Sequence, residues 1–187
     1  NQQLLKQAEY VFRQYISQAD STQTLFTDAL NRLGDCLFSS RQFDDAVATY
    51  ERAIRLGNYA TDYALFQQGY ALGLLHRYPE KIQKMGQLSS RYPRSDYADD
   101  ALYETARAHL QLDQNEEAIK MYTRILGQYP NSNKAAKAAL ELSMTYRTLK
   151  QYDKAIQAYK NTIQKYAGSE EAYAALEGLE QVYVETN

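Results

Sequence analysis

A motif that returns every 37 residues limits this chain more than any other feature of its sequence. The segments YPRSDYADDALYETA, YPNSNKAAKAALELS and YAGSEEAYAALEGLE begin at Tyr92, Tyr129 and Tyr166, so each starts 37 residues after the one before. A second motif, Ala-Ile-x-x-Tyr, occurs at Ala118–Tyr122 and returns 37 residues later at Ala155–Tyr159. Self-similarity at a period of roughly 20 to 50 residues is typical of arrays in which each unit packs on the next.

Each unit predicts a pair of helices. In the first helix, apolar and small residues recur at steps of three and four, which gives one buried face; in the third unit these are Ala98, Ala101, Leu102, Thr105, Ala106 and His109. Ser95, Ser132 and Ser169 precede such helices, where a hydroxyl can cap free amides. The second helix ends at Tyr129-Pro130, because proline pushes the preceding residue out of the α region. The sequence therefore predicts ten helices. Single helices lie at the two ends, over about 2–17 and 170–185, and four helix pairs lie between them, over about 25–56, 61–91, 96–128 and 133–165.

Small residues mark where the two helices of a pair cross. Ala46, Ala118 and Ala155 let the axes approach, and a tyrosine one turn later fills the wider gap; Gly34 and Gly69 serve the same purpose on the first helices. The second pair departs from this pattern, since Lys81 takes the small position, Met85 the tyrosine position, and Gly86 follows. We expect a shifted or shortened helix there, because a lysine at a close crossing should lift its amine to solvent.

The pattern resembles the tetratricopeptide repeat, whose signature is W-x-x-L-G-x-x-Y, A-x-x-x-F and P. It recurs here as Leu30-x-x-Leu33-Gly34-x-x-Leu37 with Ala46-x-x-x-Tyr50, and in weaker forms in later units, with an aliphatic residue or Ala in place of Trp. The resemblance implies an all-α, right-handed α-solenoid of helix–turn–helix repeats over 1–187. Its parts are a half repeat (1–20), repeats at 24–58, 60–92 (irregular), 95–129 and 132–166, and a closing half repeat (169–187). We interpret the chain as a fragment of a longer protein.

The connectors carry a narrower resemblance. The pattern YP-x-S-x-x-A-x-x-A-L, with the repeat lengthened to 37 residues, is similar to bacterial envelope proteins such as the Tol–Pal-associated coordinators and the lipoproteins of outer-membrane assembly. This resemblance implies a periplasmic or outer-membrane-associated location. A cytoplasmic location is the alternative, and the single Cys36 fits either compartment.

Composition argues against several other functions. A net charge of −2 without a basic run disfavours nucleic acid, and no stretch approaches the ~20 apolar residues of a membrane span. Cys36 has no histidine within a helical turn, and His76 and His109 stand in different repeats. Acidic pairs such as Asp44-Asp45 suit helix starts better than catalysis. We therefore predict no enzyme, no metal and no cofactor.

The function that remains is a protein–protein interaction scaffold that binds a client peptide or protein in the concave groove. By the resemblance, the groove is lined by one stripe of the first helices. The predicted partner-binding residues are Asn31, Asp35, Tyr63, Phe66, Tyr70, Tyr103, Arg107, Met144 and Arg147. Phe66, Tyr70 and Tyr103 would anchor an apolar client segment, and Arg107 and Arg147 would pair with its acids. The Lys/Asn carboxylate clamp of chaperone adaptors is missing from every repeat.

Three alternatives stay open. The same side chains could simply fill the space between adjacent repeats. The segment could be a structural spacer in a longer solenoid, with no client groove of its own. Self-association through the terminal helices, giving a homo-oligomer, overlaps with the spacer interpretation.

Overall fold

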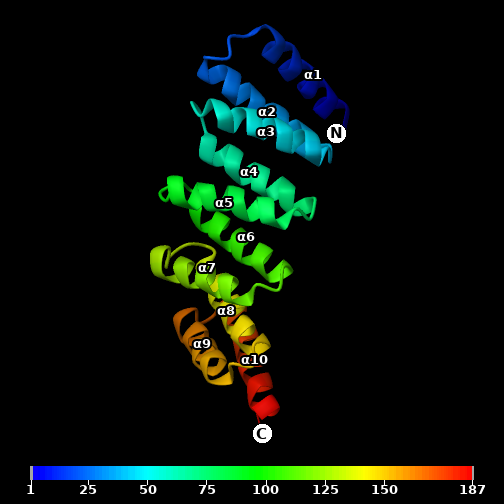
Figure 1. Cartoon of the computed structure of the whole chain (residues 1–187). Helices are drawn as coiled ribbons and strands as arrows, with labels where there is room; N and C mark the ends of the chain where they lie inside the picture. The colour runs from blue at the N-terminus through cyan, green and yellow to red at the C-terminus, as the bar shows by residue number, and fades with distance from the viewer. Residues whose placement is uncertain (1, 187) are drawn as a thin grey trace. The chain divides into compact units, whose positions relative to one another are not determined.

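The computed structural model describes residues 2–186, and within them it contains ten α-helices and no strand (Figure 1). Helices make up about 80% of the chain, which confirms the all-α prediction. Their bounds are α1 (Gln2–Gln18), α2 (Thr24–Ser39), α3 (Phe43–Leu56), α4 (Thr61–Leu74), α5 (Tyr78–Arg91), α6 (Ala98–Gln111), α7 (Asn115–Gln128), α8 (Ala135–Thr148), α9 (Tyr152–Lys165) and α10 (Glu170–Thr186). Among the described helices, none has the combination of length and apolarity needed to cross a membrane.

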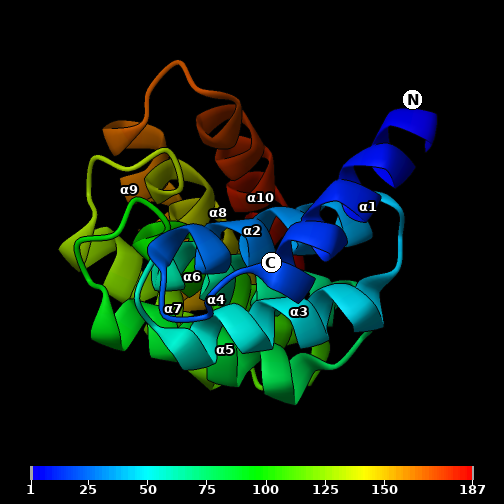
Figure 2. The same ribbon diagram turned by 90° about the horizontal axis from the view of Figure 1, so that it is seen from above.

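The chain divides into two compact units, residues 1–101 and 102–187. In the first unit each helix from α1 to α5 packs on the next one along the chain. Figure 2 shows α2 and α4 in one layer and α3 and α5 in another. In the second unit α7 packs on α8, α8 on α9 and α9 on α10, and α10 also contacts α8.

In each of the four pairs, the two helices are joined by the same type of three-residue turn. Its middle residue has a positive φ of 55–61° and is Arg41, His76, Asp113 or Lys150. In the first of these turns, the amides of Arg41 and Gln42 donate to the carbonyls of Phe38 and Leu37, which closes the helix end. The left-handed conformation costs a non-glycine residue roughly 1–2 kcal/mol, and these paired hydrogen bonds offset it. The identical turn gives every pair the same local geometry.

The small residues lie where the two helices of a pair cross, as predicted. Ala46, Ala118 and Ala155 are fully buried, and so are Tyr50, Tyr122 and Tyr159 one turn later. A Cβ added to Gly34 would lie only 2.5 Å from the ring of Tyr50. No side chain other than hydrogen fits at this contact, so glycine sets how closely α2 and α3 approach.

The expectation of a shifted or shortened helix at Lys81 was wrong. Helix α5 has 14 residues, the same length as α3, and Gly86 lies inside it. Lys81 is buried, with 6% of its surface exposed. A Cβ on Gly73 would lie 3.0 Å from both Cδ and Nζ of Lys81. The lysine fits the crossing because the facing glycine on α4 leaves room for its stem.

Serine-containing connectors follow α5, α7 and α9. Helices α5 and α7 end one residue before Tyr92-Pro93 and Tyr129-Pro130, as the prolines predict. The hydroxyl of Ser95 accepts from the amide of Tyr97, that of Ser132 from Lys134, and that of Ser169 from Ala172, each at 3.2 Å. The predicted cap is therefore confirmed at Ser169, whose partner lies in α10. The bonds at Ser95 and Ser132 reach amides of the connectors, just before α6 and α8 begin, so the caps predicted for these two helices were wrong.

Candidate functional site

Six aromatic rings form a continuous row in the first unit, which we call the aromatic row. Its members, in order of contact, are Phe43, Phe38, Tyr70, Phe66, Tyr97 and Tyr63. Successive ring centroids lie between 5.2 and 6.3 Å apart, which is the range for attractive aromatic pairs. The row contains Tyr63, Phe66 and Tyr70, so the structure brings these three predicted residues together on α4.

Two local features of the sequence build this row. Tyr63, Phe66 and Tyr70 follow one another at steps of three and four, so they share one face of α4. The connector then adds a ring from outside the helix. The hydroxyl of Ser95 donates to Oδ2 of Asp62 at 2.6 Å, which holds the connector against α4, and Tyr97 stacks on Phe66 with 22° between the ring planes.

Tyr97 was not among the predicted binding residues. The prediction followed one stripe of the first helices, and Tyr97 stands in a connector. A comparison of equivalent positions could have indicated it, because the next two units have the charged residues Lys134 and Glu171 where this unit has the aromatic Tyr97.

Asp35 joins three helices of the first unit by accepting two tyrosine hydroxyls. Tyr50 from α3 and Tyr63 from α4 both donate to its Oδ1, each at 2.7 Å. Burial, and then the bond to the Asp35 carboxylate, raise the pKa of both tyrosines far above the ordinary value. Asn31, also predicted as a binding residue, is 3% exposed, and its amide makes no hydrogen bond within the described chain. Both side chains thus lie within the packed helices.

The charges beside the aromatic row differ between Tyr70 and Tyr97. The amine of Lys81 lies 6.0 Å from the centroid of the Tyr70 ring, within reach of a cation–π interaction. Burial raises the pKa of Tyr97, and the negative charges of Asp62, Asp96 and Asp35 raise it further. A cation therefore lies beside the middle of the row, and a group of carboxylates acts near Tyr97.

The other predicted residues belong to the second unit. The ring of Tyr103 lies 5.9 Å from that of Tyr122, and the amine of Lys134 lies 6.0 Å from the Tyr103 centroid. Arg107 is the more accessible of the two arginines, with 59% of its side chain exposed and one contact of 3.4 Å to Glu104. Met144 is 46% exposed.

Arg147 already has acidic and amide partners on α10. Its Nε donates to Oε1 of Glu185 at 3.1 Å, and its Nη1 donates to Gln181. The bond from Arg147 also lowers the pKa of the Glu185 carboxyl. A client acid would have to compete with Glu185 for this arginine.

The potentially reactive side chains are held in structural roles. Burial raises the pKa of the Cys36 thiol, and the charges of Asp35 and Glu9 add to the effect, so the un-ionised form is favoured. Nδ1 of His109 pairs with Oε1 of Gln114 at 2.7 Å, and Nδ1 of His76 pairs with the hydroxyl of Tyr78 at 2.8 Å. Among the described residues, no three His, Cys, Asp or Glu side chains are grouped to hold a metal ion.

Paired helices that are joined by the same turn in every pair define a class of protein, the α-helical repeat proteins. Residues 5–62 match one tetratricopeptide repeat model, and residues 100–132 and 137–169 match a second model of the same description. These segments cover well over half of the chain. The protein therefore belongs to the tetratricopeptide repeat family.

Solved structures share this fold. A crystal structure of MamA has a TM-score of 0.65 at 20% identity, over 86% of this chain and 87% of that one. A tetratricopeptide repeat protein from Parabacteroides merdae has a TM-score of 0.72 at 18% identity, over 97% of this chain and 67% of that one. BtubC from P. vanneervenii has a TM-score of 0.72 at 13% identity, over 99% and 82%. At such identities the likeness establishes the fold alone. A comparison with curated protein sequences gives no match.

Proposed function

We propose that this chain is a non-enzymatic scaffold that binds a partner polypeptide, and that the aromatic row of the first unit is the principal contact. The observation that carries the proposal is the row itself. Its rings lie along the surface of the packed helices, and its central member, Tyr70, is 41% exposed. Aromatic side chains are enriched where proteins bind one another, because they bury a large area at a small entropic cost.

The geometry favours an extended or helical segment with planar or apolar side chains. The stacked pair of Phe66 and Tyr97 offers a ring face and its edge, and the neighbouring Tyr70 offers a partly exposed ring with a hydroxyl. Side chains of the partner that carry a positive charge fit the end near Tyr97, where three carboxylates act.

The second unit offers polar and apolar side chains of its own to a partner. Arg107 is 59% exposed, and its contact of 3.4 Å is to the carboxylate of Glu104, whose side chain is only 12% exposed. The exposed part of the Arg107 guanidinium can face an acid of the partner. Arg147 is a weaker candidate, because its donors are used by Glu185 and Gln181. Tyr103 and Met144 remain proposed apolar contacts.

A second candidate function, a spacer or oligomerisation segment, is favoured by the terminal helices. On α1, Tyr10 is 66% and Val11 58% exposed, and on α10, Tyr173 is 67% and Val184 74% exposed. Helix α1 has the pattern of a second helix and α10 that of a first helix, so each shows a face that a full repeat would cover. Contacts through these faces would link repeats or copies of the chain without any client.

A location in the bacterial cell envelope is part of the proposal. It is supported by the YP-x-S connectors and by the lengthened repeat, whereas none of the matched structures described above carries an envelope description. Fractionation of cells that express the full-length protein would test it. Recovery with the periplasm or outer membrane supports the envelope, and recovery with the cytoplasm overturns it.

The experiment that tests the function compares two triple variants of the intact protein in affinity capture. One variant changes Phe66, Tyr70 and Tyr103 to Ala, and the control changes Tyr10, Leu25 and Tyr173 to Ala, which are at least as exposed. We expect the first variant to lose the captured partner and the control to keep it, with both still helical by circular dichroism. Capture that survives the first variant and is lost in the control would establish the terminal faces as the functional ones.

A further inference from the structure

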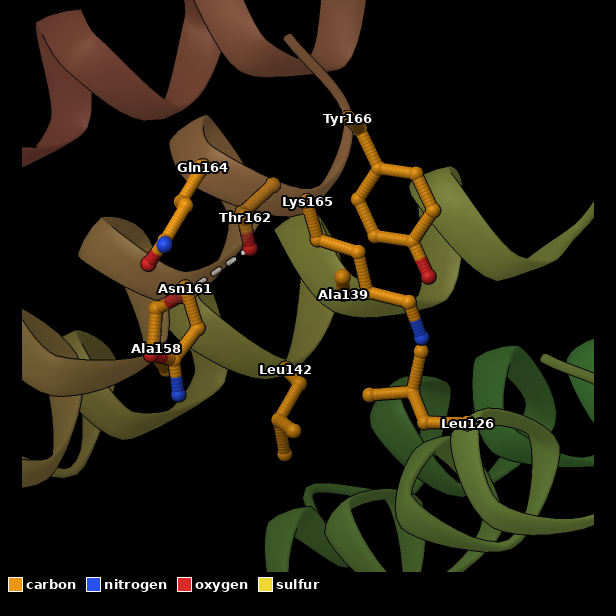
Figure 3. A pocket seen from close by; sticks show the side chains of 9 residues that line it. All are labelled: Leu126, Ala139, Leu142, Ala158, Asn161, Thr162, Gln164, Lys165 and Tyr166. Atoms are coloured by element: carbon orange, nitrogen blue, oxygen red, sulfur yellow. Dashed lines mark hydrogen bonds between the residues drawn. The ribbon is translucent and has the colours of Figure 1, made fainter.

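The second unit contains a hollow of about 610 Å³ at the ends of α7 and α9 and along α8. Its floor is apolar and is formed by Leu126, Ala139, Leu142 and Ala158, and two polar side chains, Lys165 and Tyr166, stand at one side (Figure 3). None of the predicted binding residues lines it. A volume of this size lies within the range of roughly 300–1,000 Å³ found for small-molecule sites.

The hollow exists because two side chains are smaller here than at the same place in other repeats. Ala139 stands where the preceding pairs have Leu30, Leu65 and Leu102. Each of those leucines is buried, with at most 1% of its surface exposed. Leucine in place of Ala139 would add three carbon atoms to the floor. A similar difference separates Ala158 from Met121, its counterpart one repeat earlier.

The hollow is open to solvent on one side, and its apolar floor is a surface that a ligand can cover. Two apolar clusters flank the position. Leu126 and Leu142 pack against the cluster around Tyr122, and Ile163 packs against the cluster around Tyr159. Ala139 lines the hollow together with Leu126 and Leu142, and 7% of its surface is exposed. An apolar ligand body would restore the missing contacts.

The polar side of the hollow has unused hydrogen-bonding capacity. The hydroxyl of Tyr166 is buried and has no hydrogen-bond partner within the described residues, which is costly for a buried polar group. Among the described residues, Lys165 forms no ion pair. Its Nζ lies 5.4 Å from the centroid of the Tyr166 ring. Figure 3 shows the amine and the hydroxyl on the same side of the hollow, next to Leu126. The Thr162 hydroxyl, in contrast, already donates to the carbonyl of Ala158.

We propose that this hollow binds a small carboxylate with an apolar body about the size of a large side chain. The body lies on Leu126, Leu142 and the methyl groups of Ala139 and Ala158. The carboxylate accepts a hydrogen bond from the Tyr166 hydroxyl and faces the ammonium group of Lys165. This site is separate from the aromatic row, so it does not depend on the proposed function.

The test is a titration of the whole chain with 3-phenylpropanoate, followed by amide chemical shifts in NMR spectra, and a parallel titration with the neutral 3-phenylpropanamide. The wild type should show saturable shifts at the floor residues, with the carboxylate bound more tightly than the amide. Ala139→Leu fills the floor and should weaken both probes by about tenfold or more. Lys165→Gln should remove the preference for the carboxylate and leave the amide unchanged.

A matched control is present on the same helix. Lys154 also lies over a tyrosine ring, that of Tyr146 at 5.6 Å, but does not line the hollow, so Lys154→Gln should leave both titrations unchanged. If Ala139→Leu fails to fold, Ala158→Met supplies the same test with the residue found at position 121. The proposal is overturned if neither probe gives saturable shifts, or if a folded Ala139→Leu or Ala158→Met variant binds both probes as the wild type does.

Discussion

In the first unit the hydroxyl of the buried Tyr50 donates to Asp35, whereas in the second unit the hydroxyl of Tyr122 is buried without a partner and that of Tyr159 has the Arg147 side chain beside it but no acceptor. The three tyrosines occupy the same place in their repeats. The difference follows from the facing first helix, where the place of Asp35 is taken by Arg107 in one pair and by Met144 in the next. An arginine has no acceptor to offer, and a thioether is a weak one.

The surfaces of the two units differ in a related way. In the first unit the connector places Tyr97 on Phe66 and completes a row of rings. In the second, the corresponding pair is Lys134 over Tyr103. Turns and crossings therefore stay the same between the units while the polar and aromatic chemistry on them changes. Positions on the first helices and in the connectors are thus where one repeat acquires a role that its neighbour lacks.

The largest expected effect concerns a contact that both units share. Gly34→Ala should destabilise the protein by about 2–3 kcal/mol, because its Cβ would lie 2.5 Å from the Tyr50 ring. Gly178→Ala should do the same in the second unit, where the Tyr159 ring would lie 2.6 Å away. Gly86→Ala and Gly127→Ala are the controls, since a Cβ there meets nothing within 4 Å. Urea denaturation followed by circular dichroism should show both controls stabilised by about 0.5–1 kcal/mol.

The next effect separates the two units. Tyr50→Phe should cost about 1.5–2 kcal/mol, because it removes a hydrogen bond to a carboxylate. Tyr122→Phe should be neutral or slightly stabilising, because it removes a buried hydroxyl that has no partner. Equal losses in the two variants, measured in the same urea series, would mean that the two units do not differ at this position.

A smaller effect distinguishes the units by pH. Burial would raise the pKa of Glu51 in the first unit, but hydrogen bonds from Lys84 and Gln68 outweigh it and hold the pKa below the ordinary value. That stabilisation is present above the ordinary carboxyl pKa and is lost as the pH falls through the lowered one. In the second unit, burial raises the pKa of Glu141, and the charge of Arg107 opposes this only in part. Its ionisation therefore destabilises the fold as the pH rises.

Two glutamine variants measure this difference. At pH 7, Glu141→Gln should raise the Tm and Glu51→Gln should lower it, each by roughly 2 °C. At pH 4 both differences should shrink, because the carboxyls are then largely protonated in the unfolded chain. Thermal melts by circular dichroism at the two pH values suffice. A Glu141→Gln variant that is less stable than the wild type at pH 7 would contradict the assignment of Glu141 as a buried, weakly compensated acid.

Periodicity was enough to predict the helices, the cap at Ser169 and the small residues at the crossings, because each follows from local spacing. Features that depend on a second element were missed. Lys81 fits because Gly73 lies opposite, Arg147 is paired because α10 brings Glu185 to it, and Tyr97 joins the row from a connector. The hollow at Ala139 arises because a small side chain stands where other repeats have leucine, and a motif does not indicate such a difference. Only a comparison of equivalent places in the repeats indicates it.

Site-specific photo-crosslinking tests the central claim, that the aromatic row binds a partner, most directly. A photoreactive phenylalanine analogue would replace Tyr70 in the full-length protein within its own cells, and the control would replace Tyr59, which is 46% exposed and outside the row. We predict a discrete adduct from position 70 that Phe66→Ala and Tyr97→Ala abolish, and no such adduct from position 59. The same adduct from both positions, unchanged by the two alanine substitutions, would contradict the proposal.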